Sequence, residues 1–254
     1  MTCFYRLIFQ TVIMFGMIHA AWCDSNTPKD AYYYPAIESV GFISRDSVPF
    51  AGTIHSNEHN QVMSGWDHIL YIKPYRNYFF KKNALFVAYG PVEDVYSDNV
   101  FMGVHYQIKG VVEIIAMKPR FVKARIAKSY LPIRKGDHIK PYEKINHYIP
   151  ITDDVPYIRS HVIASEGTRR MIGQGDIVFI NKGQKNGVRP GNIFDIFEHQ
   201  EKDFEMSRRT VFVDPSNRYP SGQLLILTTQ RLTAAGLITW SKNELLMAHQ
   251  LDVH

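Results

Sequence analysis

Gly173-Gln174-Gly175-Asp176-Ile177-Val178-Phe179-Ile180 is the most informative stretch of the chain, because the same pattern occurs once before it. The earlier copy is Ser64-Gly65-Trp66-Asp67-His68-Ile69-Leu70-Tyr71-Ile72. Each stretch begins with a short polar turn and continues as an apolar run, which is typical of a tight turn that opens a strand. The two stretches therefore indicate two copies of one β-rich module.

A second pair of markers lies downstream and supports the repeat. Gly110-Val111-Val112-Glu113-Ile114-Ile115 has a counterpart in Gly222-Gln223-Leu224-Leu225-Ile226-Leu227. Each run leads to a serine after the same interval, at Ser129 and at Ser241. An equal interval in two places is hard to produce by chance. The duplicated residues are those of core strands and turns, so they indicate an architecture and leave the activity open.

The length and composition of the chain suit two β domains. Its 254 residues suffice for two domains with their own cores, at roughly 100–150 residues each. Tyr and Phe number 15 each, and these side chains favour strands over helices. Short strand candidates alternate with Gly and Pro at an even spacing, at residues 50–55, 68–73, 84–89, 106–117 and 121–129. We expect an all-β fold of two tandem, related, small antiparallel β-barrel or sandwich modules after a signal peptide.

The segments that flank and join the modules differ from them in composition. We expect a signal peptide at residues 1–23, a polar lead-in at 24–39 and the first module at 40–142. A linker at 143–156 carries Pro150, Pro156 and the acidic pair Asp153-Asp154, which is typical of a semi-extended connector. The second module then covers residues 157–254.

The first residues predict export. Arg6 is the only charged side chain before an apolar run at residues 7–18, and Ala20 and Ala21 follow it, as in a signal peptide. We expect a protein of the periplasm, or one associated with the outer membrane, in a Gram-negative bacterium. The signal is cleaved, kept as an anchor or lipidated at Cys23, and the bulky Trp22 in front of that cysteine disfavours lipidation. Because Cys3 lies within the signal, the exported chain has no internal disulfide.

The formal net charge of +5 is compatible with anionic partners. The basic residues, however, occur as scattered pairs and accompany no recognisable nucleic-acid motif. We therefore interpret most of them as solvated strand edges and turns, and we expect no nucleic-acid partner.

The strand–loop–strand at residues 175–197 carries a resemblance to known families. Gly175-Asp176-Ile177-Val178-Phe179-Ile180, followed by a loop with Gly187 and Gly191, resembles the C-terminal module of the flagellar assembly protein T family. It resembles more closely the region behind the LysM domain in a group of exported bacterial proteins. The first copy matches in part, at residues 41–43, 51–54, 110–112 and 136–139. The resemblance implies a non-enzymatic β protein of the cell envelope.

Three departures limit what this resemblance implies. No LysM-like segment precedes residue 40, so peptidoglycan binding is not carried over. Trp66-Asp67 replaces the Gly-Asp pair in the first copy, and Ala248-His249 stands where the second copy would end in Gly-Asp.

No residue pattern in the chain predicts catalysis, a metal site or a cofactor. His55 and His59 have the spacing of zinc ligands on a helix, but their surroundings are those of a polar turn after a strand, with no third ligand. No Gly-x-Ser-x-Gly motif is present. Asp67 and Asp176, at matching places in the two copies, predict turn-capping carboxylates. The residues that we expect to shape turns are Asp67, Asp176, Gly183, Gly187 and Gly191.

A loop of the first module is the best candidate for binding. Tyr75-Arg76-Asn77-Tyr78-Phe79-Phe80-Lys81-Lys82 replaces the Gly-rich loop of the second module with aromatic and basic residues. Aromatic side chains and cations are typical of binding surfaces for proteins or glycans, although filling of the module's core explains the aromatic residues equally well. The candidate binding residues are Tyr75, Arg76, Tyr78, Phe79, Lys81 and Lys82.

We therefore expect a non-enzymatic scaffold or assembly component of the bacterial envelope that acts through protein–protein contacts. Its partners would be envelope proteins, for example those of an appendage or secretion complex. The alternative is a periplasmic protein that binds peptidoglycan or another anionic glycan, which the positive charge and the aromatic residues favour.

Overall fold

The computed structural model describes residues 30–76, 78–198, 219–247 and 251–253. Strands account for 53% of the described residues and helix for 3%, which confirms the all-β prediction. The expected signal peptide, Cys23, and the pair Ala248-His249 lie outside the described residues.

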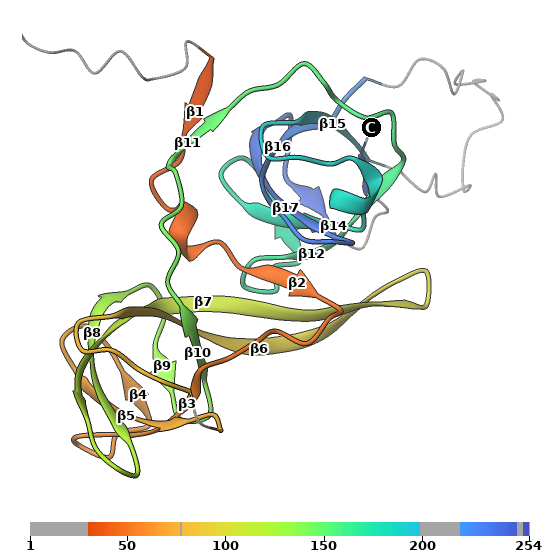
Figure 1. The fold of residues 1–254 in the computed structure, drawn as a ribbon. Coiled ribbons are helices and arrows are strands. Elements are labelled where there is room, and N and C mark those ends of the chain that lie inside the picture. The colour runs from red at the N-terminus through yellow and green to blue at the C-terminus, as the bar shows by residue number, and fades with distance from the viewer. Residues whose placement is uncertain (1–29, 77, 199–218, 248–250, 254) are drawn as a thin grey trace, which may run out of the picture.

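Six strands of the first module form a ring (Figure 1). Its sheet runs in the order β2-β7-β6-β10-β3-β5-β8 and curls until β8 also pairs with β7. The strands of this sheet are β2 (Phe42–Ser44), β3 (Gly52–Asn57), β5 (Ile69–Pro74), β6 (Leu85–Ser97), β7 (Val100–Met117), β8 (Val122–Ser129) and β10 (His138–Pro141).

The second module is a closed antiparallel barrel of six strands in the order β12-β14-β17-β16-β15-β19. The connection between β14 and β15 holds a single 3-10 turn, η2 (Gln184–Asn186). The strands of the barrel are β12 (Ser160–Ser165), β14 (Ile177–Ile180), β15 (Ile193–Glu198), β16 (Gly222–Thr229), β17 (Ala234–Ser241) and β19 (Leu251–Val253).

The two modules have the same strand connectivity. Reading round the first ring as β3-β5-β8-β7-β6-β10 gives the chain order that the second barrel repeats as β12-β14-β17-β16-β15-β19. Each module adds one short two-stranded pairing, β4 (Met63–Ser64) with β9 (Ile133–Arg134) and β13 (Met171–Ile172) with β18 (Leu245–Leu246). The repeat in the sequence is therefore a repeat of the fold.

The downstream markers occupy equivalent register positions. Gly110 lies opposite Ser129 and Gly222 lies opposite Ser241, and a β-bulge interrupts each pairing in the next steps. The glycines are needed because the partner backbone approaches closely. A Cβ on Gly110 would lie 2.3 Å from the Lys128 carbonyl oxygen, and one on Gly222 would lie 2.9 Å from that of Trp240.

The turns before β5 and β14 correct one prediction. The backbone N–H of Asp67 donates to Ile126 O in the first module, and the N–H of Gly175 makes the equivalent bond to Ile238 O. Both residues have positive φ, 65° and 92°. Asp67 is therefore equivalent to Gly175 and not, as predicted, to Asp176. The mismatch arises because an aspartate in the first copy takes the left-handed position that a glycine takes in the second.

The described residues form four clusters of buried apolar side chains, and the three largest hold the molecule together. One fills the first ring and one fills the second barrel. The third lies between the modules, and strand alternation explains it: Val178 and Ile180 of β14 face the interior of the barrel, whereas Ile177 and Phe179 belong to the core between the modules. The unbroken apolar run of β14 is therefore buried on both faces.

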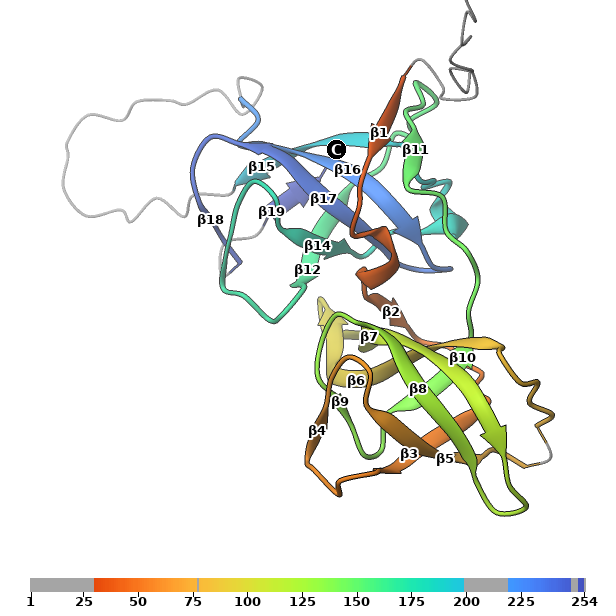
Figure 2. The same ribbon diagram turned by 90° about the vertical axis from the view of Figure 1, so that its left-hand side faces the viewer.

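The long hairpin β6–β7 supplies much of the surface that meets the second module (Figures 1 and 2). Its strands extend well beyond the ring, and β2 pairs with that extension, Phe42 opposite Tyr106. Val95 and Met102 of the hairpin enter the core between the modules, and Asn181 Nδ2 donates to Ser97 Oγ at 2.9 Å. The hairpin thus anchors one module on the other.

The lead-in and the linker pair with each other instead of running as free connectors. Strand β1 (Ala31–Tyr33) and strand β11 (Tyr148–Pro150) form an antiparallel ribbon, followed along the lead-in by a 3-10 turn, η1 (Ile37–Ser39). Ile37 and Ile149 are buried in the core between the modules. These segments therefore help to fix the relative position of the modules.

Candidate functional site

The predicted binding loop joins β5 to β6 and is anchored from within. Phe80 is 3% exposed and packs into the core of the first ring. The Tyr78 ring lies 4.9 Å from that of Phe80, and the Tyr75 ring lies 4.3 Å from that of Phe50. Core filling thus accounts for Phe80 and restrains the rest of the loop.

The six candidate binding residues all lie on the surface. Phe79 is 79% exposed, although it directly precedes the buried Phe80. Tyr75 and Tyr78 are exposed along one side, and the Arg76 guanidinium lies 5.1 Å from the centre of the Tyr75 ring. Lys81 and Lys82 are exposed as well. The loop therefore presents aromatic and cationic groups on a fixed base.

A second surface segment joins this loop, and the sequence did not single it out. The turn between β7 and β8 exposes every residue from Met117 to Phe121. Because Ile72 pairs with Val122, this turn and the loop after β5 lie at the same end of the first module. The ring of Phe121 lies 5.2 Å from that of Tyr71. The pairing of β5 with β8 and that of β6 with β7, in which Leu85 lies opposite Glu113, bring the two segments together.

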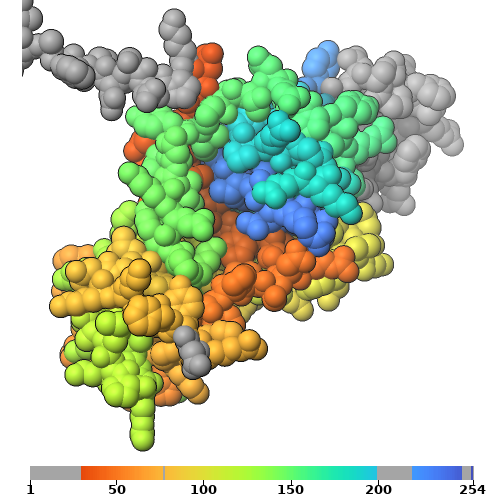
Figure 3. All heavy atoms as spheres, viewed as in Figure 1, coloured from red at the N-terminus to blue at the C-terminus, as the bar shows by residue number. Residues whose placement is uncertain are grey.

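The combined surface is the aromatic–basic end, which points away from the second module (Figures 2 and 3). Its apolar members are exposed to between 37% and 79% of their surface. It comprises Lys73, Tyr75, Arg76, Tyr78, Phe79, Lys81, Lys82, Met117, Lys118, Arg120 and Phe121.

The aromatic–basic end carries positive charge without matching carboxylates. Residues 71–85 and 114–125 contain no Asp or Glu. The acidic groups on neighbouring strands are already paired, since Glu113 accepts from Arg125 at 2.9 Å and Glu58 lies 3.5 Å from Lys123. Among the described residues, no carboxylate pairs with any of the six cations of this end, Lys73, Arg76, Lys81, Lys82, Lys118 and Arg120. The six positive charges at this end outnumber the formal net charge of the whole chain, which is +5.

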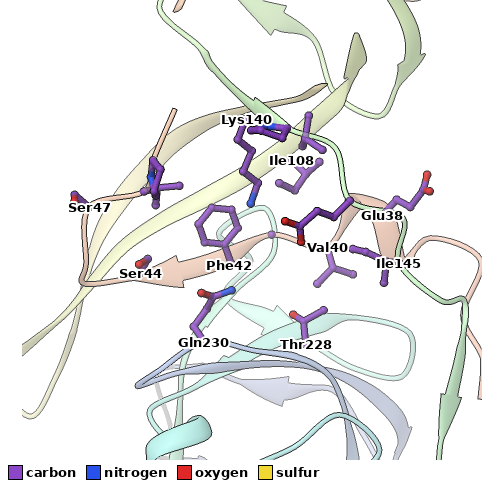
Figure 4. Close-up of a pocket in the computed structure, with 16 residues that line it drawn as sticks. Glu38, Val40, Phe42, Ser44, Ser47, Ile108, Lys140, Ile145, Thr228 and Gln230 are labelled. Atoms are coloured by element: carbon purple, nitrogen blue, oxygen red, sulfur yellow. The ribbon is translucent and has the colours of Figure 1, made fainter. Parts of the chain in front are cut away.

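A cavity of about 450 Å³ lies where the two modules and the linker meet (Figure 4). Phe42 and Lys140 line it from the first module, and Thr228 and Gln230 line it from the second. The Lys140 ammonium lies 4.5 Å from the centre of the Phe42 ring, and burial lowers the pKa of Lys140. The volume is that of a small-molecule pocket. The groups around it include no nucleophile paired with a base, so nothing here assigns a reaction.

Glu38 of η1 lies at the edge of this cavity and binds three donors from the first module. Lys128 Nζ donates at 2.5 Å and Tyr130 Oη at 2.8 Å, and Tyr142 also donates. Burial opposes ionisation of Glu38, but these hydrogen bonds outweigh it and lower its pKa to about 2. Glu38 is therefore a structural carboxylate.

His105 is fully buried between the modules, with no hydrogen bond to either ring nitrogen. Its ring lies 4.7 Å from that of Phe179, and its Nε2 lies 4.0 Å from a carboxylate oxygen of Glu166. The same oxygen accepts the backbone N–H of Gly41 at 3.2 Å. His105 packs as a filler of the interface.

The predicted turn residues shape loops at the ends of the strands. Asp176 accepts the backbone N–H of Gly173 at 3.0 Å and binds Arg169. Gly187 ends η2 in the left-handed conformation. A Cβ on Gly183 would lie 2.3 Å from Gln230 O, and one on Gly191 would overlap Pro150 O. In the described part of the chain, the Asp67 side chain caps no backbone N–H, so its predicted capping role is wrong.

The described residues contain no group of three or more His, Cys, Asp or Glu side chains placed to hold a metal ion. His59 lies near His68, with ring centres 6.3 Å apart. Neither of the short helices in the described part of the chain has the length and apolarity needed to cross a bilayer. Comparison with family models and with curated proteins finds no match for this chain.

Proposed function

We propose that this protein is a non-enzymatic scaffold or assembly component of a bacterial cell envelope. It acts by holding two docking surfaces at fixed positions, and no covalent bond is made or broken. The observation that carries the proposal is the core shared by the modules, because it joins them into one body with exposed aromatic groups at both ends.

The rigidity follows from the number of independent segments in that core. The lead-in, the hairpin β6–β7, the linker and the outer face of the second barrel all contribute buried apolar side chains. A polar contact reinforces it, since Thr233 Oγ1 donates to Ile43 O at 2.7 Å across the modules. Interfaces that are large and apolar restrict the motion of one domain against another.

The docking surfaces lie at opposite ends of the molecule (Figures 1 and 2). One is the aromatic–basic end. The other is the tyrosine ribbon, which consists of Tyr32 and Tyr33 on strand β1 and Tyr148 on strand β11. The exposed fractions of these side chains are 38%, 54% and 41%, in that order. The rings of Tyr33 and Tyr148 lie 4.9 Å apart. Because tyrosine is enriched in protein interfaces, we assign protein partners to this ribbon.

Crosslinking in intact cells tests the proposal. The tagged full-length chain is crosslinked, the cells are fractionated, and the captured proteins are compared with those of a Tyr33→Ser/Tyr148→Ser variant. A Tyr157→Ser variant is the matched control, because Tyr157 is 95% exposed and lies outside the ribbon. We expect a defined set of envelope proteins that the double variant loses and the control keeps. Recovery of the chain from the cytosolic fraction, or an identical set from all three, would contradict the proposal.

Binding of peptidoglycan or another anionic glycan is the second candidate function. The unpaired cations of the aromatic–basic end favour it, because a polyanion would neutralise several of them at once. Sedimentation with purified peptidoglycan at rising ionic strength tests this alternative. Binding that salt abolishes would support it, and a chain that stays in the supernatant at low salt would exclude it.

A further inference from the structure

The aromatic–basic end has features that a protein or glycan partner does not explain. We propose that this end docks on the surface of a membrane rich in anionic phospholipids. The proposal rests on the proposed function in one respect, that this end is a docking surface. It goes further in naming what the surface meets.

The exposed apolar side chains lie on two separate protrusions. Phe79 comes from the loop after β5, whereas Met117 and Phe121 flank the turn between β7 and β8. Their exposed fractions are 79%, 48% and 37%. Such side chains gain free energy by leaving water, and the acyl boundary of a bilayer accepts them without requiring a complementary shape.

Every charged side chain of the same protrusions is cationic. Lys81 and Lys82 follow Phe79 and Phe80 in the first, and Lys118 and Arg120 lie between Met117 and Phe121 in the second. A cation beside an inserted apolar group stays at the level of the headgroups, where anionic phosphates are its counterions. The apolar tips thus match the acyl boundary of an anionic membrane, and the flanking cations match its headgroup level.

The composition favours a lipid over the other partners. Four of the six cations are lysines, and lysine is depleted in protein–protein interfaces. An anionic glycan would satisfy the cations but offers no apolar interior for Met117, Phe121 and Phe79 together. Docking through this end also leaves the tyrosine ribbon pointing away from the bilayer (Figure 2), as a scaffold requires.

The test uses the full-length chain and vesicles of two compositions, phosphatidylcholine alone and phosphatidylcholine with phosphatidylglycerol as the minor lipid. Co-sedimentation measures the partition coefficient, and hydrogen exchange read by mass spectrometry locates the contact. We expect at least about tenfold stronger partitioning with phosphatidylglycerol, since each cation near an anionic surface contributes on the order of a fivefold change. Protection is expected in residues 78–85 and 117–122. The exchange map separates this contact from any insertion of the apolar N-terminal run.

Two pairs of substitutions separate charge from insertion. Lys81→Glu/Lys82→Glu is expected to lower partitioning to the anionic vesicles by more than about tenfold, whereas Lys185→Glu/Lys242→Glu, at exposed sites on the second module, keeps most of it. Phe79→Ser/Phe121→Ser is expected to lower the part of the vesicle partitioning that remains at high salt, because that part depends on the apolar side chains. The substituted positions are on the surface, and thermal unfolding checks that each variant is folded.

Several outcomes would overturn the membrane assignment. Equal partitioning to both vesicle types, protection confined to other segments, or insensitivity to both pairs of substitutions would each do so. A polyanion would be the partner instead if the chain bound soluble dextran sulfate as tightly as it binds vesicles, and if the Phe79→Ser/Phe121→Ser variant bound dextran sulfate with unchanged affinity. If vesicle binding fails while the tyrosine ribbon still captures envelope proteins, the scaffold proposal stands and only the membrane partner is wrong.

Discussion

Phe80 and Val188 occupy the same place in the two modules. Each lies in the connection that follows the second strand of its ring, three residues before a residue with positive φ, Asn83 or Gly191. Each side chain packs into the core of its own module. The binding loop is therefore a variant of a repeated loop, with its inner residue kept for packing and its outer residues free to change.

Phe80→Ala is expected to destabilise the protein by about 3–5 kcal/mol, because truncating a buried Phe removes apolar contacts and leaves a cavity. Phe79→Ala is the matched control, since its ring is mostly in water, and it is expected to change stability by less than about 0.5 kcal/mol. Urea unfolding followed by circular dichroism measures both. Equal effects would show that Phe80 does not hold the loop.

Gly110→Ala tests the close approach in the first ring. The added Cβ would lie 2.3 Å from Lys128 O, so strands β7 and β8 must separate, at a cost of about 1–3 kcal/mol. Gly65→Ala is the control, because no atom lies within 4 Å of its added Cβ. Thermal unfolding compares the two. A Gly110 variant as stable as the Gly65 variant would mean that the register at Ser129 is not tightly specified.

Glu38→Gln is expected to remove a pH-dependent part of the stability. Because the pKa of Glu38 is lowered to about 2 in the folded chain, its contribution is fully present above the ordinary carboxyl pKa and is lost as the pH falls through the folded value. The shift corresponds to about 2 kcal/mol after allowing for the exposed Lys128.

Denaturant unfolding between about pH 2 and 7 measures this contribution. The ordinary carboxyl pKa of about 4.3 marks the pH below which the contribution begins to be lost. The difference between wild type and Glu38→Gln should shrink steadily below that value. The exposed Glu143 offers a control, Glu143→Gln, which should follow the wild type throughout. A difference that is constant with pH would show that the carboxylate charge contributes nothing.

His105→Leu is expected to stabilise the protein by about 1 kcal/mol. Both ring nitrogens of His105 are buried without a hydrogen bond, and such groups cost about 1–3 kcal/mol each. Leucine keeps the apolar contact with Phe179. Calorimetry measures the shift in melting temperature, and a clear loss of stability would reveal that the imidazole makes a polar contact in solution.

The repeat and its strands were predictable because they depend on local rules. Gly110 and Gly222 are separated from Ser129 and Ser241 by the same number of residues, and one hairpin geometry imposes that spacing. The equivalence of Asp67 and Asp176 was predicted wrongly, because residue identity does not reveal which position has positive φ. The surface at Met117–Phe121 was missed for a different reason, since it lies far in sequence from the loop that it joins.

The amino-acid sequence alone indicates that the protein is all-β, that its module occurs twice, and that the loop after β5 is rich in aromatic and cationic side chains. Those properties follow from alternation, turn residues and composition, which act over a few residues at a time. Three features become visible in the tertiary structure alone: β14 is buried on both faces, the lead-in pairs with the linker, and two distant turns form one surface. These features depend on strand pairing and on packing between modules, and no local pattern in the chain encodes which distant segments will meet.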